Sequence, residues 1–188
     1  MKTLISILFI LLILGGCSNK APSIKQYYRL SPDYPGTIIS TDNKRDSVVI
    51  ARPRTFSILG GRPMVATKDD GALVQLNNHY WLESPTVLLH VILKDWAQQH
   101  WQHIHTSAAF DERHDRLESK ILAFEKDGNQ AKVTLQFILR NGDGRLLLDQ
   151  TYQQSLTIQG DGYAHFVKTM NLAISHILEE LNGALAQL

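Results

Sequence analysis

The chain contains a single cysteine, Cys17, so no disulfide within the chain can hold its fold together. Cys17 closes an N-terminal segment that begins with Met1-Lys2 and continues with an apolar run from Leu4 to Leu14. A basic start, a short apolar core and small residues before a cleavage site are typical of a secretory signal peptide. The run is too short to span a hydrocarbon core of roughly 30 Å, which takes about 20 residues. We therefore expect residues 1–16 to be a removed signal peptide, and the rest of the chain to be stabilised by packing alone.

The sequence Leu14-Gly15-Gly16-Cys17 resembles the bacterial lipobox. In proteins with this motif, a signal peptidase cuts before the cysteine, and its sulfur and new amino group are acylated. We therefore expect a covalent S-diacylglycerol and N-acyl lipid on Cys17, and no other cofactor. Several acyl chains together give stable membrane anchoring. The alternative is an ordinary signal peptide that a cysteine follows by chance.

The residues after Cys17 bear on where the lipid anchor is sorted. Residues 18–23 are polar and are expected to form a short tether to a single domain over residues 24–188. In Gram-negative lipoproteins, an aspartate after the cysteine resembles an inner-membrane retention signal. Ser18 therefore favours the outer membrane, with the domain facing the periplasm.

The charge balance argues against nucleic acid as a partner. Removing Lys2 with the signal peptide leaves 18 basic and 18 acidic residues, and no basic run is present. A protein that tracks a phosphate backbone needs a concentrated positive surface.

Turn residues and alternation predict several strands and a first helix. Residues 24–30 and 47–51 are strand candidates, and residues 62–67 and 72–77 flank Asp69-Asp70-Gly71 as a hairpin. Ser84 and Pro85 then suit a helix N-cap and first turn, which predicts a helix over residues 85–102.

The second half of the chain predicts a meander followed by a long helix. Residues 117–126, 130–140 and 145–158 are separated by glycine-containing turns, and Val133, Leu135, Phe137 and Leu139 alternate along the middle segment. From Tyr163 onward, apolar residues recur as one helical stripe, which favours packing on a sheet over a partner coiled coil. The expected fold is therefore α+β, a mainly antiparallel sheet with two amphipathic helices packed on one face.

Several segments resemble one known family, the ABC-type transport auxiliary lipoproteins, the group that contains paraquat-inducible protein C. The resemblance rests on the lipobox, on Tyr-Tyr-Arg-Leu at residues 27–30, and on residues 48–96. It also includes a segment near the family's R-W-A-E-P, which Trp81, Glu83 and Pro85 match, with Ser84 inserted. Tyr80 stands in place of the arginine and Leu82 in place of the alanine. Residues 117–125 with Gly128 resemble the family's I-x-x-F-E strand and its turn.

This resemblance implies a non-enzymatic accessory subunit of an ABC/MCE-type intermembrane lipid transport system. The lipid anchor would link the system to the outer membrane, and an MCE-domain protein would be the partner. Two rival functions are a lipid carrier that binds acyl chains in its own fold and a lipoprotein regulator of a cell-wall synthase. Self-association into a homo-oligomer is left open.

Two segments are candidates for a partner surface. Phe56, Ile58 and Leu59 are apolar residues in a loop-like region, and if exposed they would suit docking. Trp81 beside a helix start suits either the core or an interface anchor.

The remaining polar clusters do not predict catalysis or a metal site. His100, His103 and His105 are read as a polar helix end, because zinc needs three or four ligands in fixed geometry. His114 and the acidic residues around it, Asp111, Glu112 and Asp115, are read as a solvated loop.

Overall fold

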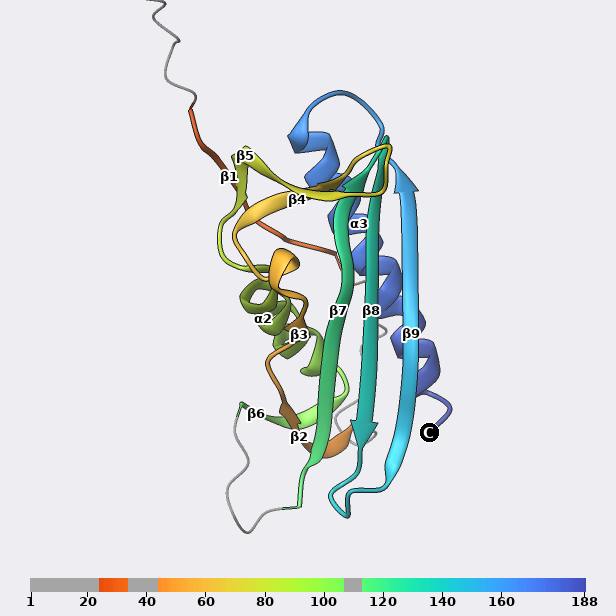
Figure 1. The fold of residues 1–188 in the computed structure, drawn as a ribbon. Coiled ribbons are helices and arrows are strands. Elements are labelled where there is room, and N and C mark those ends of the chain that lie inside the picture. Colours follow the sequence, from red (N-terminus) through yellow and green to blue (C-terminus); the bar gives the residue numbers. More distant parts are fainter. Residues whose placement is uncertain (1–23, 34–43, 107–112) are drawn as a thin grey trace, which may run out of the picture.

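Three long antiparallel strands form the largest part of the sheet in the computed structural model, which describes residues 24–33, 44–106 and 113–188 (Figure 1). They are β7 (Asp115–Asp127), β8 (Gln130–Arg140) and β9 (Leu146–Thr157), which form the predicted meander. The β7–β8 turn requires Gly128, whose φ of +53° lies in the left-handed region. The middle strand buries its alternating apolar residues, which are Ala131, Val133, Leu135, Phe137 and Leu139.

The other edge of β7 makes the sheet mixed. Three short strands pair with it one after another, all parallel to β7: β2 (Arg45–Ile50), β3 (Arg54–Thr55) and β4 (Pro63–Thr67). β6 (Trp101–His105) extends β2 in parallel. β5 (Leu73–Trp81) forms the predicted hairpin with β4, and β1 (Gln26–Tyr28) is parallel to β5.

The expectation of a mainly antiparallel sheet was wrong. Five of the eight strand pairs among the described residues are parallel. Alternation identifies a strand, but the direction of its neighbour depends on the connections between distant segments.

Both helices contribute to one hydrophobic core with the sheet. α3 (Tyr163–Leu185) packs along β8 and β9, whereas α2 (Pro85–Ala97) packs near β2 and β6 (Figure 1). The predicted stripe of α3 is buried at Val167, Met170, Ile174, Ile177 and Leu181, while Leu188 beyond the helix is exposed. Among the described residues, no helix has the length and apolar character needed to cross a membrane.

The end of α2 differs from the prediction. The helix stops at Ala97, and the residues expected to continue it turn and form β6. Ser84 occupies the N-cap position, but its side chain makes no capping bond and its Oγ lies 3.1 Å from Thr86 Oγ1. Local helical spacing did not reveal that Trp101 leaves the helix to pack against Trp96, at 6.0 Å between ring centroids.

Candidate functional site

The joint between β5 and α2 holds the three family-motif residues Trp81, Glu83 and Pro85. Trp81 ends β5 and is 1% exposed, between Phe124 of β7 at 5.4 Å and Phe166 of α3 at 6.0 Å between ring centroids. Pro85 is buried at the start of α2, and Glu83 is exposed. Because its ring is enclosed on all sides, Trp81 fixes β5 and α3 together and offers no surface to a partner.

The segment that follows β3 separates its apolar residues between surface and core. Phe56 is 52% exposed and precedes a short 3₁₀ turn, Ser57–Leu59. The Lys120 ammonium lies over the Phe56 ring, 4.9 Å from its centroid, which is a cation–π contact. Ile58 is half-buried against the core. Leu59 is only 3% exposed, so the expectation that it belongs to a docking surface is corrected: its side chain points into the core.

The histidine segment is divided between a buried turn and a strand. His100 is buried, and its Nε2 lies 2.7 Å from Asn182 Oδ1 of α3. Burial lowers the pKa of His100, and the hydrogen bond to Asn182 opposes that shift. His103 and His105 follow on β6, where alternate residues share a face. Among the described residues, no group of three or more His, Cys, Asp or Glu is placed to hold a metal ion.

The acidic cluster near His114 is partly structural. Asp115 begins β7; its Oδ2 accepts a hydrogen bond from Arg45 Nε at 2.6 Å and another from Trp101 Nε1 at 2.9 Å. His114 Nδ1 lies 2.7 Å from Ser47 Oγ. The interpretation of these two residues as a solvated loop was therefore wrong. Asp111 and Glu112 lie outside the described residues.

The strand resembling I-x-x-F-E contains a buried carboxylate. Glu125 is 5% exposed; its Oε2 accepts a hydrogen bond from the Phe124 backbone N–H at 2.7 Å, and Lys132 Nζ lies 4.0 Å from its Oε1. Burial raises the pKa of Glu125, and the Phe124 hydrogen bond and Lys132 oppose that shift. The register shift between Ile121 and Ala123 lies just before this residue, so the motif marks an irregular, polar point in the sheet.

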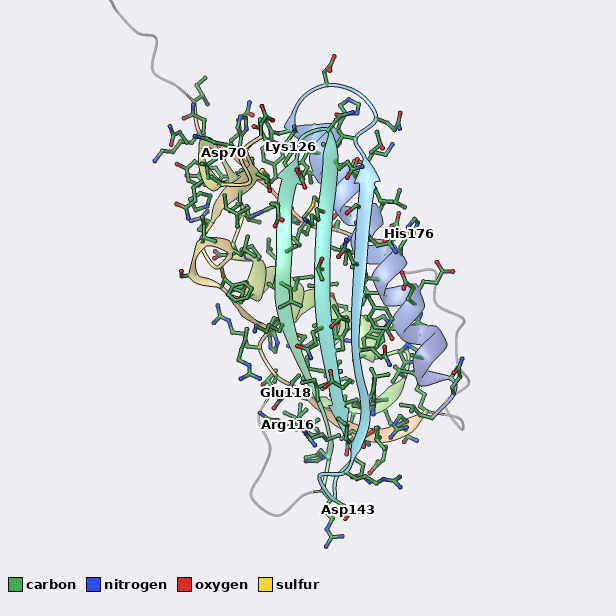
Figure 2. All side chains as sticks on the ribbon, turned by 45° about the vertical axis from the view of Figure 1, so that its right-hand side comes forward. Asp70, Arg116, Glu118, Lys126, Asp143 and His176 are labelled. Carbon is green, nitrogen blue, oxygen red and sulfur yellow. The ribbon has the colours of Figure 1, made fainter. Side chains whose placement is uncertain are left out.

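A groove of about 730 Å³ runs between α3 and the end of β9. Leu156 and Leu172 give it apolar surface, and Leu172 is 49% exposed. His165, Lys168 and His176 of α3 also line it, together with polar residues; Figure 2 shows His176 on this helix. Most of the lining surface is apolar, but charged Asp33, Lys168 and Glu179 also line it, so the groove suits an amphiphilic ligand or a peptide better than a bare acyl chain.

Comparison with known proteins assigns this chain to a family. The family model described as "ABC-type transport auxiliary lipoprotein component" matches residues 28–182, more than three quarters of the chain. The chain belongs to this family. No curated protein matches its sequence.

Two crystal structures share the fold of this auxiliary lipoprotein. One, of an uncharacterized protein, has a TM-score of 0.68 at 17% identity and covers 84% of this chain and 96% of the other. The other, of a Xanthomonas campestris protein assigned to DUF330, has a TM-score of 0.70 at 16% identity and covers 84% and 93%. At such low identity the likeness concerns the fold alone.

The family match in this auxiliary lipoprotein starts after the predicted anchor. Cys17 and Ser18 precede the matched span and lie outside the described residues, so their lipid attachment and sorting remain predictions. The matched span does include the Trp81 joint, the Phe56 segment and the groove.

Sequence reasoning missed two polar residues that organise the core of this auxiliary lipoprotein. Asn182 interrupts the apolar side of α3 next to Leu178 and Leu181, and Glu125 interrupts a strand of apolar residues. An isolated polar residue among apolar neighbours was the available signal, because such a group leaves water only where it finds a partner.

Proposed function

We propose that this protein is the membrane-anchored periplasmic accessory subunit of an ABC/MCE-type lipid transport system and links that system to the outer membrane. The observation that carries the proposal is the family match over residues 28–182, in a chain that begins with a lipobox-like segment. An accessory subunit of this kind works by holding a partner and a membrane in a fixed relation. Its surfaces therefore matter more than any reacting group.

We place the surface for the MCE-domain partner at Phe56 and Ile58. Phe56 is a large aromatic side chain held half out of the protein, with Lys120 over its ring. Beneath it, the buried Leu59 fixes the 3₁₀ turn to the core. A rigidly mounted, half-exposed aromatic residue suits an interface anchor, because aromatic residues are enriched at interfaces.

Affinity purification from detergent-solubilised membranes tests this function. The lipidated protein is expected to bring down an MCE-domain protein together with an ABC permease and ATPase, identified by mass spectrometry. Recovery of a cell-wall synthase in their place would support the rival regulator function. A Phe56→Ala protein, with Val91→Ala as the matched control, should lose the partners while the control keeps them. Val91 suits this purpose because it is an apolar residue that is 51% exposed and belongs to another element, α2.

The lipid-carrier function has one supporting feature, the groove beside α3. Its test is to extract lipid from the purified protein after removing detergent. Stoichiometric phospholipid that is lost on Leu172→Gln would favour the carrier function. We expect no such lipid beyond the covalent anchor, because the charged side chains of Asp33, Lys168 and Glu179 line the groove.

A further inference from the structure

An aromatic and cationic patch covers the outer side of β1 and β5. In this β1–β5 patch, Tyr27 and Tyr80 are register partners whose ring centroids lie 5.4 Å apart. The Lys25 ammonium lies 5.6 Å from the Tyr80 ring centroid, and the Arg62 guanidinium 5.1 Å from that of Tyr27. We define the patch by these four residues. Tyr27 is 50% exposed, and Lys25 and Arg62 are also exposed.

The charges of the patch are left without carboxylate partners. Within the described ranges, neither Lys25 nor Arg62 forms an ion pair, whereas the Arg45, Arg113 and Arg116 side chains each do. Stacking on the tyrosines holds both cations at the surface, so the patch presents positive charge on an aromatic platform. This chemistry favours an anionic, partly apolar ligand.

Exposed apolar residues also gather around the patch. Ile24, which precedes Lys25, is 81% exposed, and Leu82, two positions after Tyr80, is 38% exposed. The residues that alternate with the patch have the opposite environment. Trp81 is buried, and Tyr28 packs against the core. The outer face of these strands is therefore unusually apolar for a surface that meets only water.

The position of the patch in the chain identifies the surface it faces. Ile24 is seven positions after Cys17, and an extended chain spans at most about 3.6 Å per residue. This distance rests on the proposed lipid attachment at Cys17, which places the start of the patch within roughly 25 Å of the bilayer. A tether this short gives the patch a high effective concentration at the lipid surface.

We propose that the β1–β5 patch lies against the headgroups of an anionic phospholipid leaflet and fixes the orientation of the domain on the membrane. Tyrosine is enriched at headgroup level, and cations near an anionic leaflet are attracted to it. The lipid chains hold the protein at the membrane but leave its orientation free; the patch removes that freedom. The turn at Asp143, at the opposite end of the long strands from Asp70 in Figure 2, then points away from the membrane.

Fluorescence quenching on vesicles tests the orientation. The acylated full-length protein is placed on phosphatidylcholine vesicles with or without phosphatidylglycerol, both doped with a headgroup-nitroxide lipid. A fluorophore is attached at Asn78→Cys, which shares a face of β5 with Tyr80, or at Asp143→Cys. Because Cys17 carries lipid, the introduced cysteine is the free thiol. The position 78 probe should be quenched strongly on anionic vesicles, and the position 143 probe weakly.

Charge variants identify the cause of the quenching. Each cation near an anionic leaflet changes the equilibrium constant for contact between the patch and the membrane about fivefold. The double variant Lys25→Gln, Arg62→Gln should therefore lower this equilibrium constant about 25-fold. The control, Lys168→Gln with Arg145→Gln, removes the same charge elsewhere and should change nothing. Equal quenching of the two probes overturns the proposal. An equal loss of quenching in the two double variants also overturns it. Absence of quenching on the anionic vesicles, with the protein still bound to them, also overturns it. Failure to float with vesicles at all contradicts the lipid anchor itself.

Discussion

Trp96 of α2 donates a hydrogen bond from Nε1 to Oδ1 of Asn182 on α3, at 2.7 Å, across 86 positions of the chain. The same oxygen lies 2.7 Å from His100 Nε2, so the neutral imidazole donates to it as well. Both donors come from buried side chains. Asn182 therefore joins the two helices through one polar point inside an otherwise apolar layer.

Replacing Asn182 with alanine should destabilise the protein strongly. Each buried donor that loses its acceptor costs about 1–3 kcal/mol. A chain of this size loses about 2–4 °C in melting temperature for each kcal/mol. Thermal melting of Asn182→Ala beside Lys168→Ala, an exposed change on the same helix, measures the difference. Equal melting temperatures for the two variants would show that the two hydrogen bonds make no net contribution to the free energy of unfolding.

Acidification should weaken the fold through His100. Its folded pKa is lowered from 6.5, so the unfolded chain binds the proton first as pH falls. The stability that depends on neutral His100 is fully present above about pH 6.5 and is lost as pH falls from there through the folded pKa. Denaturant unfolding between about pH 8 and 5.5 should show a steeper loss in wild type than in His100→Gln. Gln102→Ala changes an exposed, non-titrating residue of β6 and should follow the wild-type curve. A His100→Gln curve that runs parallel to the wild-type curve would contradict the assignment.

The meander could be predicted from the sequence because its signals are local. Val133, Leu135, Phe137 and Leu139 alternate on one strand, and Gly128 marks the turn before it. The hairpin of β4 and β5 follows the same rule, with its turn at Asp69-Asp70-Gly71.

The short parallel strands could not be predicted in this way. β3 has only two residues, and β6 has five and begins one short turn after α2, so neither shows a periodic pattern of its own. Their pairing with β7 and β2 depends on contacts between distant segments. The burial of Leu59 was hidden for a related reason, because a 3₁₀ turn sends neighbouring side chains to different sides.

Phe56 and Leu59 should respond to truncation in opposite ways. Leu59→Ala removes a buried side chain and should cost about 2–5 kcal/mol of stability. Phe56→Ala changes a half-exposed ring and should leave the melting temperature nearly unchanged while weakening association with the partner. Melting and co-purification of both variants provide the comparison. If Phe56→Ala melts as low as Leu59→Ala, the ring is a packing element and the partner surface lies elsewhere.

The lipid anchor predicts two separable results. Cys17→Ser should abolish incorporation of labelled palmitate and leave uncleaved precursor, because acylation and cleavage both require the cysteine. Ser18→Asp should keep the lipid but move the protein from outer-membrane to inner-membrane fractions on a sucrose gradient in an enteric-type host. Palmitate label retained by Cys17→Ser would contradict the lipid anchor. Wild-type protein found in the inner-membrane fraction would contradict the proposed sorting.

Site-specific photocrosslinking in living cells tests the proposed function most directly. A photoreactive phenylalanine analogue replaces Phe56, and in a control strain it replaces Asp143, which is exposed in the β8–β9 turn. After irradiation, mass spectrometry identifies the captured protein. We predict capture of an MCE-domain protein from position 56 and none from position 143. Capture of a cell-wall synthase from position 56, or of no MCE-domain protein from it while that protein is expressed, would contradict the account.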